Sequence, residues 1–192
     1  MRLELRVDLK TVDLVRETAW SALTEKLGWG AVLDDLRRSV LWRFDIADGD
    51  EAAVCAALEA ELERTSAFYN PNKERRRLLA GGALPEGEPL AAADALDPPS
   101  APGARLWRAL VWITDEGGEQ TALRRRTARR LPGLSGLRAG TLWELALRAD
   151  TAAMARGLAT GLALTRRRRQ GLLLNPHYQE GWLLALAPGE EA

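Results

Sequence analysis

The residues best suited to catalysis are scarce in this chain. Among its 192 residues there is one histidine, His177, and one cysteine, Cys55. A Ser/His/Asp site or a histidine-based metal centre would have to use His177, which follows Pro176 where a turn residue is expected. Cys55 stands among alanines, without a basic neighbour that would lower its pKa, so we expect a small core residue. The sequence therefore predicts no catalytic residue, no metal site and no cofactor.

Three arginine runs are the second source of possible chemistry. Residues 75–77, 124–126 with 129–130, and 166–169 could contact phosphate groups or nucleic acid. The last run closes an expected helix, where positive charge favours the helix dipole without any ligand. Aromatic side chains are not interleaved with the arginines, so no base-stacking platform is indicated. We expect this charge to face solvent or a protein partner, and the sequence disfavours nucleic-acid binding.

A glycine pair is a weaker candidate. Gly117 and Gly118 precede an expected helix and could approach a phosphate group. The chain lacks the G-x-x-x-x-G-K-[ST] pattern that cradles nucleotide phosphates, so a plain turn is the favoured interpretation.

An internal repeat organises the chain. Residues 36–46 align with residues 137–147, with identity at four of the eleven positions and apolar character kept at most others. After a further helical stretch, each copy reaches an Asn-Pro pair, Asn70-Pro71 and Asn175-Pro176. A repeat in the same order over most of the chain indicates two copies of one small domain. One chain can then do what a dimer of shorter chains could do.

The hydrophobic pattern places these residues on strands, helices and turns. Alternation predicts half-buried strands, spacing of three and four predicts helices, and Gly28 predicts a helix end. Trp42 and Trp143 fall on the apolar face of each central strand and are expected core residues. In the first copy we expect strands over 3–9 and 36–46, helices over 13–27 and 50–62, and a last strand after Asn70-Pro71. In the second we expect strands over 106–113, 137–147 and 182–186, and helices over 120–131 and 154–162.

The expected fold class is α+β. Each copy reads as β-α-β(β)-α-β, which gives an antiparallel sheet with both helices on one face, the ferredoxin-like arrangement. Leu41 and Leu142 lie on the other face, which we therefore expect to be covered as well. The predicted organisation is repeat 1 over 1–79, a partly mobile linker rich in Pro, Gly and Ala over 80–104, and repeat 2 over 105–188, forming a pseudo-two-fold unit.

Composition and charge bound the setting of the protein. The alternating start of the chain is no signal peptide, no apolar run approaches the roughly 18 residues of a membrane span, and one cysteine gives no intrachain disulfide. A cytoplasmic protein without a membrane segment is expected. The net charge is zero, but residues 1–100 carry 13 Lys and Arg against 19 Asp and Glu, and the rest carry 14 against 8. This asymmetry is explained equally well by attraction between the copies and by drift of surface charge.

The order of these motifs resembles the PurS family, the small subunit of phosphoribosylformylglycinamidine (FGAM) synthase in purine biosynthesis. Residues 7–10, Val-Asp-Leu-Lys, resemble the end of the family's first strand, and residues 138–145, Arg-Ala-Gly-Thr-Leu-Trp-Glu-Leu, resemble its central strand. Residues 70–74 match its Asn-Pro-x-x-Glu turn, and residues 175–179 keep Asn-Pro but end in Gln. The similarity covers both copies, which makes the chain look like a fused PurS dimer.

The resemblance assigns family-motif positions rather than catalytic ones. These are Lys10, Asn70, Pro71, Glu74, Arg138, Gly140, Glu144, Asn175 and Pro176. The chain departs from the family at Thr141, where Lys is usual, and in the Asp-Pro-x-Gly segment. That segment is reduced to Asp13 in the first copy and to Asp115 and Gly118 in the second.

The resemblance implies a non-catalytic role in an ATP-dependent amidotransferase complex. The chain would bridge a PurL-type synthetase subunit and a PurQ-type glutaminase subunit, support ammonia transfer between them, and possess the family's capacity for self-association. The alternative is a diverged PurS-like tandem that binds a small ligand or another protein outside purine synthesis. A third hypothesis is an RNA-binding protein that uses its arginines, with affinity falling steeply as salt rises.

Overall fold

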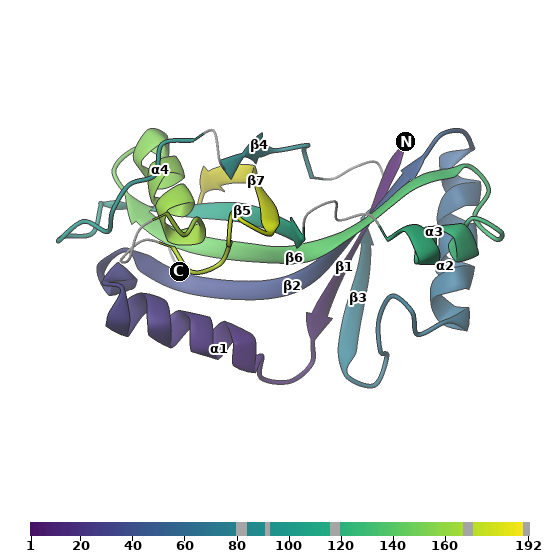
Figure 1. The fold of residues 1–192 in the computed structure, drawn as a ribbon, viewed down its shortest axis with the longest axis horizontal. Helices are drawn as coiled ribbons and strands as arrows, with labels where there is room; N and C mark the ends of the chain where they lie inside the picture. Colours follow the sequence, from purple (N-terminus) through teal and green to yellow (C-terminus); the bar gives the residue numbers. More distant parts are fainter. Residues whose placement is uncertain (80–83, 91–92, 116–119, 167–170, 190–192) are drawn as a thin grey trace. The chain divides into compact units, whose positions relative to one another are not determined.

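The structure is a computed structural model that describes residues 1–79, 84–90, 93–115, 120–166 and 171–189. It has an α+β fold, and its strands follow one another in the order β3-β1-β2-β6-β5-β7-β4 (Figure 1). The strands are β1 (Arg2–Leu9), β2 (Leu33–Ile46), β3 (Glu74–Leu79), β4 (Glu88–Pro89), β5 (Arg105–Asp115), β6 (Leu134–Ala149) and β7 (Gln179–Pro188). The α-helices are α1 (Leu14–Ser21), α2 (Glu51–Arg64), α3 (Thr121–Thr127) and α4 (Ala152–Ala163). These elements confirm the predicted order of strands and helices.

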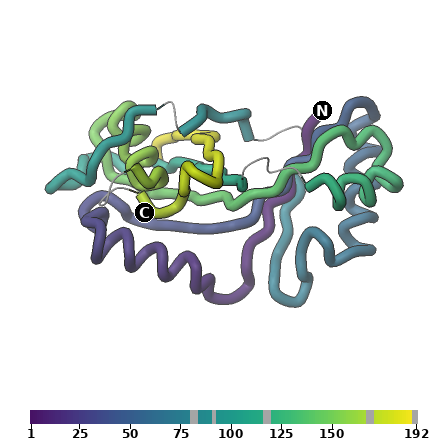
Figure 2. Tube along the Cα trace, viewed as in Figure 1, coloured from purple at the N-terminus to yellow at the C-terminus, as the bar shows by residue number. Residues whose placement is uncertain are grey.

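The chain divides into two compact units, each built from three stretches of sequence. Unit 1 comprises Met1–Thr11, Ser39–Ala83 and Gly117–Thr141. Unit 2 comprises Val12–Arg38, Leu84–Glu116 and Leu142–Ala192. Figure 2 traces the path of the chain through these stretches.

Unit 1 contains β1, β3, α2 and α3, with the second part of β2 and the first part of β6. β1 pairs antiparallel with β2 on one side and β3 on the other, so that Leu5 lies opposite both Trp42 and Leu78. In Figure 1, α2 and α3 are labelled close together at the right of the picture. The buried core residues are Leu3, Leu5, Val7, Phe44, Ile46, Val54, Leu58, Leu62, Phe68, Leu131, Leu134 and Leu137.

Unit 2 contains β4, β5, β7, α1 and α4, with the remaining parts of β2 and β6. β7 pairs antiparallel with β5 and with the short strand β4, and the β5–β7 register shifts between Leu110 and Val111. Each of these elements except β4 contributes side chains to the core of unit 2. Leu90, the residue that follows β4, also packs in this core. The largest fully buried side chain in this core is Trp29, in the turn before β2.

Each unit combines elements of both predicted repeats. Unit 1 takes its first strand, second helix and last strand from residues 1–79, but its first helix, α3, from the second repeat. Unit 2 takes β5, α4 and β7 from residues 105–188, but its first helix, α1, from the first repeat. Apart from β4, which belongs to unit 2 alone, the two units therefore contain the same kinds of element with the roles of the repeats exchanged.

The helix ends follow from local sequence. The side chains of Asp13, Asp50 and Thr151 accept hydrogen bonds from backbone N–H groups at the starts of α1, α2 and α4. α1 continues into a π-helical turn, Ala22–Lys26, and Gly28 follows with φ +83°, as the predicted helix end requires. α3 ends at Thr127, four residues before the predicted end, and a turn follows in which the Leu131 N–H donates to the Thr127 carbonyl at 2.9 Å before Pro132.

Part of the predicted linker is packed against unit 2. In β4, Glu88 lies opposite Leu183 and Pro89 opposite Trp182, and Leu90 is 1% exposed. The N–H of Leu96 donates to the carbonyl of Gly157 in α4 at 3.0 Å. These described residues are therefore held against unit 2's strand and helix by hydrogen bonds. None of the helices in the described ranges combines the length and apolar character needed to cross a membrane.

The sheet face opposite the helices is covered at Leu41 and Leu142, which are at most 1% exposed. Glu4 and Arg43 stand at charged positions of strands that the alternation predicts to be half-buried, and both are nevertheless buried. Both side chains are at most 1% exposed, and Arg43 Nε donates to Glu4 Oε1 at 2.8 Å within unit 1. A strand pattern gives the alternation of faces but does not show which face water reaches.

Candidate functional site

The first Asn-Pro motif forms a tight turn before β3 in unit 1, called here the Asn70 turn (residues 70–74). Asn70 Oδ1 accepts from the N–H of Asn72 at 3.0 Å, and the Asn70 carbonyl accepts from Lys73 at 3.0 Å and Glu74 at 2.8 Å. The Glu74 carboxylate accepts from the Asn70 N–H at 2.6 Å. The final Glu of the motif thus closes the turn on its first residue.

The second Asn-Pro motif repeats these hydrogen bonds in unit 2, in the Asn175 turn (residues 175–179). Asn175 Oδ1 accepts from the N–H of His177 at 3.1 Å, and the Asn175 carbonyl accepts from Tyr178 at 3.2 Å and Gln179 at 3.0 Å. Gln179 Oε1 accepts from the Asn175 N–H at 3.0 Å. Because a side-chain carbonyl can replace a carboxylate as this acceptor, Gln179 preserves the turn.

Lys10 lies beside the Asn70 turn and forms hydrogen bonds with it. Its N–H donates to the Lys73 carbonyl at 2.9 Å, and its ammonium donates to the Pro71 carbonyl at 2.5 Å. In unit 2 the corresponding contact is from Gln179 Nε2 to Asp115 at the end of β5, at 3.2 Å. Lys10, Asn70, Pro71 and Glu74 therefore lie together, and their shared role is to fix where the last strand begins.

The β6 positions of the family motif lie away from this turn and have other contacts. Arg138 is 3.7 Å from Asp45, which also accepts from Arg2 at 2.8 Å in unit 1. Glu144 accepts from Arg108 at 3.1 Å in unit 2. Gly140 lies on β6 without a positive φ angle. These contacts are ion pairs between neighbouring strands, not an assembled catalytic site.

An apolar groove lies beside α1 in unit 2 and is called the α1 groove. Its cavity is about 460 Å³, and on α1 it is edged by Leu14, which is 74% exposed, and Val15, which is 54% exposed. Exposed aliphatic side chains that gather at a cavity are typical of a binding surface. The lining residues are Leu14, Val15, Thr18, Ala19, Trp143, Leu172 and Leu173.

Charged residues fix the start of α1 at this groove. Asp13 caps the helix by accepting from Val15 and Arg16, and its second oxygen is 3.0 Å from Arg38. The Arg38 guanidinium lies 6.0 Å from the ring centroid of Trp143, in the range of a cation–π contact. Asp13, which the resemblance aligns with the start of an Asp-Pro-x-Gly segment, thus links α1 to the central strand. No sequence pattern pointed to Arg38.

An equivalent hollow lies beside α3 in unit 1 and is called the α3 hollow. It measures about 580 Å³ and is lined by Ala67, Gln120, Thr121, Ala122, Leu123 and Arg126. Ala67 and Leu172 both stand three residues before an Asn-Pro pair. Both cavities therefore lie between the first helix of one repeat and the same loop position of the other. The α1 groove is lined mainly by apolar side chains, whereas the α3 hollow has three apolar residues and three polar or basic ones.

The remaining candidates show little sign of chemistry. The pKa of Cys55 is raised by burial and by the nearby carboxylates of Glu51 and Glu59, which disfavours a reactive thiolate. His177 lies in a turn, as predicted. Over the described ranges there is no group of three or more His, Cys, Asp or Glu residues placed to hold a metal ion.

The arginine runs differ in their contacts. Arg76 donates to Glu59 and to the Tyr69 hydroxyl, and its guanidinium lies 5.4 Å from the Tyr69 ring centroid, so it is a structural residue of unit 1. Gly117, Gly118 and residues 167–169 lie outside the described residues. In the run on α3 and the turn after it, Arg125, Arg126, Arg129 and Arg130 are exposed.

Comparisons with known proteins found no matching family model, no matching curated protein and no matching solved structure.

Proposed function

We propose that this chain is a PurS-like, non-catalytic accessory subunit of a cytoplasmic FGAM synthase. In this role it bridges a PurL-type synthetase subunit and a PurQ-type glutaminase subunit, and supports the passage of ammonia from one to the other. It contributes no residue to the chemistry of either partner. The proposal rests on the motif resemblance, and the geometry of the motifs supports it.

The observation that carries the proposal is the hydrogen bonding of the two Asn-Pro turns. Four hydrogen bonds recur at equivalent atoms in the Asn70 turn and the Asn175 turn, although only Asn and Pro are common to both sequences. Recurrence of a motif's geometry with changed side chains is what duplication of one module would leave. One element of the resemblance, the Asn-Pro turn, therefore has the same hydrogen bonding in both copies.

The composition of the units supports a fused dimer of ferredoxin-like modules. α3 completes the unit that holds the first repeat's strands, and α1 completes the unit that holds the second repeat's strands. Exchange of an identical element between subunits is a common way to build a dimer. A tandem chain can make the same exchange within itself.

The test is reconstitution with the synthetase and glutaminase of the same organism. We expect the tagged full-length chain to retain both subunits, and FGAM formation from glutamine to fall when the chain is omitted. Formation from added ammonium should change little, because free ammonia does not need transfer between subunits. Absence of the chain from the complex, or an intact purine pathway after deletion of its gene, would contradict the proposal.

The α1 groove supports a second candidate, a module that binds an apolar ligand outside purine synthesis. Cavities of this volume with mostly apolar walls are typical of small-molecule sites. A thermal-shift screen of apolar metabolites distinguishes the two functions. Stabilisation of the wild-type chain that is lost in Ala19→Phe, without any retained synthetase, would favour this candidate.

A further inference from the structure

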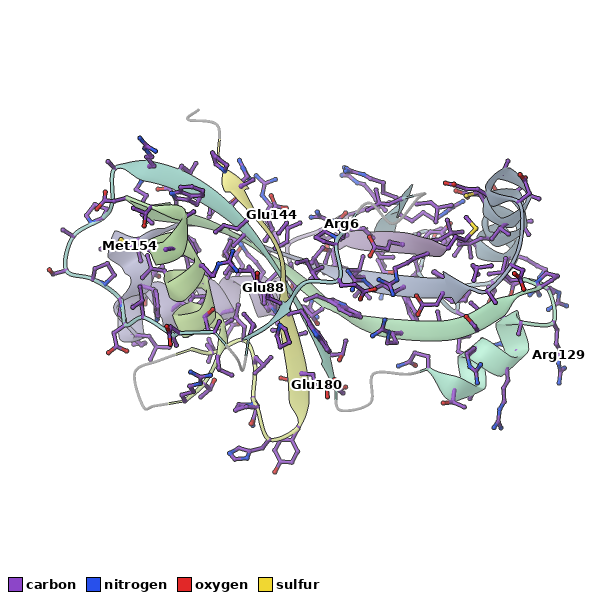
Figure 3. The ribbon with its side chains drawn as sticks, turned by 90° about the horizontal axis from the view of Figure 1, so that it is seen from above. Arg6, Glu88, Arg129, Glu144, Met154 and Glu180 are labelled. Atoms are coloured by element: carbon purple, nitrogen blue, oxygen red, sulfur yellow. The ribbon has the colours of Figure 1, made fainter. Side chains whose placement is uncertain are left out.

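The surface formed by α3 and the turn after it exposes four arginines, called here the α3 arginines: Arg125, Arg126, Arg129 and Arg130. None of the four makes an ion pair among the residues that the structure describes. Leu123, Thr127 and Leu131 form the stripe that packs inward, so the arginines occupy the remaining surface. In Figure 3, Arg129 lies just beyond α3 at the outer edge of the molecule.

This arrangement costs stability in the isolated chain. Arg125 precedes Arg129 by four residues and Arg126 precedes Arg130 by four, and Ala128 between them keeps helical dihedral angles. Like charges four residues apart on helical backbone repel each other, and here the second arginine of each pair lies in the turn after α3. The helix dipole offsets part of the repulsion, but among the described residues no carboxylate forms an ion pair with these arginines.

The arginines at α1, the equivalent helix of unit 2, form ion pairs. On α1, Arg16 lies 2.6 Å from Glu17 and 3.4 Å from Asp35, and Arg38 beside it is paired with Asp13. The first helix of a repeat can therefore fold with its arginines paired. The α3 arginines have no such ion pair among the described residues, so they are available to carboxylates of another molecule.

The α3 hollow adjoins these charges and shares Arg126 with them. Its volume of about 580 Å³ accommodates an apolar side chain against Ala67, Ala122 and Leu123. Arginine binds carboxylates through two parallel N–H···O bonds, which suits a protein segment rich in Asp and Glu. None of the six lining residues is aromatic, so the hollow offers no surface for stacking a base.

We infer that the α3 arginines and the α3 hollow together bind an acidic segment of a partner protein, with its carboxylates on the arginines and one apolar side chain in the hollow. This deepens the proposed function by naming the chemistry of one partner surface, and it rests on that function only for the partner's identity. The equivalent α1 groove is apolar, so the two copies present different surfaces to two different partners.

The test uses the full-length chain and a fluorescently labelled peptide of alternating Glu and Asp with one central Phe. Fluorescence anisotropy at low salt should show binding that weakens as salt is added. The double variant Arg126→Glu/Arg130→Glu should weaken binding at least about tenfold. The matched control is Arg75→Glu/Arg77→Glu, which changes the same net charge at exposed β3 arginines of the same unit and should alter affinity by less than about twofold.

A second variant separates charge from shape. Ala122→Trp fills the hollow without changing any charge and should weaken the peptide several-fold, while its far-UV circular dichroism stays that of the wild type. Equal losses in the β3 control, or no binding at low salt, would overturn the inference. So would tighter binding of a single-stranded oligonucleotide of equal charge.

The peptide assay contains neither synthetase nor glutaminase. Failure of the reconstitution with normal peptide binding therefore refutes the proposed function alone. A normal reconstitution without peptide binding refutes the inference alone.

Discussion

The Glu4–Arg43 ion pair is the residue-scale feature with the largest expected effect on stability. Both side chains are at most 1% exposed, and Arg43 Nε lies 2.8 Å from Glu4 Oε1. Because Glu4→Gln leaves a buried guanidinium without its counter-charge, we expect a loss of about 3–5 kcal/mol in the free energy of unfolding. Urea denaturation followed by circular dichroism measures the loss.

Two further variants test this explanation of the Glu4–Arg43 pair. The double replacement Glu4→Leu/Arg43→Met removes both charges and should recover most of the lost stability, since apolar residues of similar volume can replace a buried pair. Asp34→Asn breaks the exposed pair with Arg148 and should cost less than about 1 kcal/mol. A similar cost for the buried and exposed single variants would contradict the assigned role.

Asp35 provides a prediction about acid stability. Burial alone would raise the pKa of Asp35, but hydrogen bonds from Arg37 and the Leu36 N–H, with the nearby guanidinium charges, lower it below its ordinary value of 3.8. A lowered pKa in the folded state contributes stability above the ordinary value, which is lost as pH falls through the folded pKa. The group is one-third exposed, so we expect about 0.5 kcal/mol.

The measurement for Asp35 compares wild type with Asp35→Asn in urea titrations over a range of pH. The stability difference should be constant above about pH 5 and shrink below about pH 4. A difference that persists unchanged into strong acid would show that the side chain acts through shape and not through charge.

At this scale the sequence predicted turn residues better than ion pairs. Asn70 and Asn175 were recognisable because Asn before Pro bonds to nearby backbone wherever it occurs. Arg43 was not, because its burial depends on what covers the second face of its strand. Arg38 and Asp13 are 25 residues apart in sequence, and nothing local indicates that such residues meet.

At the scale of elements, the packing of Leu96 on α4 depends on two glycines. A Cβ on Gly161 would lie 1.9 Å from the Leu96 carbonyl oxygen, whereas one on Gly157 would overlap with the Leu96 side chain, at 2.6 Å, and would make only an ordinary contact with backbone, the Asp94 carbonyl oxygen at 3.6 Å. Gly161→Ala gains about 1 kcal/mol in helix propensity, but the overlap with backbone forces the segment away from the helix. We expect a net loss of about 2 kcal/mol and faster proteolysis between residues 84 and 104.

Gly157→Ala is the matched control for Gly161→Ala. The Leu96 side chain can rotate away, so the gain in helix propensity should roughly cancel the contact, leaving stability within about 1 kcal/mol of wild type. Limited proteolysis and urea denaturation of both variants provide the comparison. Equal effects of the two substitutions would mean that the close approach of Leu96 to α4 does not hold this segment.

Element types and order were predictable, while their ends and partners were only partly so. The apolar stripe Val15, Ala19 and Leu23 identifies a helix but fits any apolar face of suitable size, so it does not indicate that α1 packs in the second repeat's unit. The short β4 has two residues, one of them Pro, and lacks the alternation that marks a strand. The Pro- and Gly-rich composition therefore gave no indication that β4 pairs with another strand.

At the scale of the whole molecule, the exchange of first helices makes each unit depend on both halves of the chain. The core of unit 1 includes Leu131, Leu134 and Leu137, and the core of unit 2 includes Trp29 and Leu36. Burying one such side chain contributes about 1.5–3 kcal/mol, and a whole domain is stable by only about 5–15 kcal/mol. Neither half should therefore form its unit as a monomer.

Dividing the chain between Ala83 and Leu84 tests this dependence. Each fragment expressed alone should lack a cooperative thermal transition as a monomer, because the helix that completes its unit lies in the other fragment. Co-expressed fragments should elute together and melt like the intact chain. Because the repeats have the same order of elements, two copies of one fragment could also exchange their first helices. Such a homodimer would likewise support the exchange of first helices in the intact chain. A fragment that melts cooperatively as a monomer would show that its own first helix can complete its unit, and would contradict the exchange.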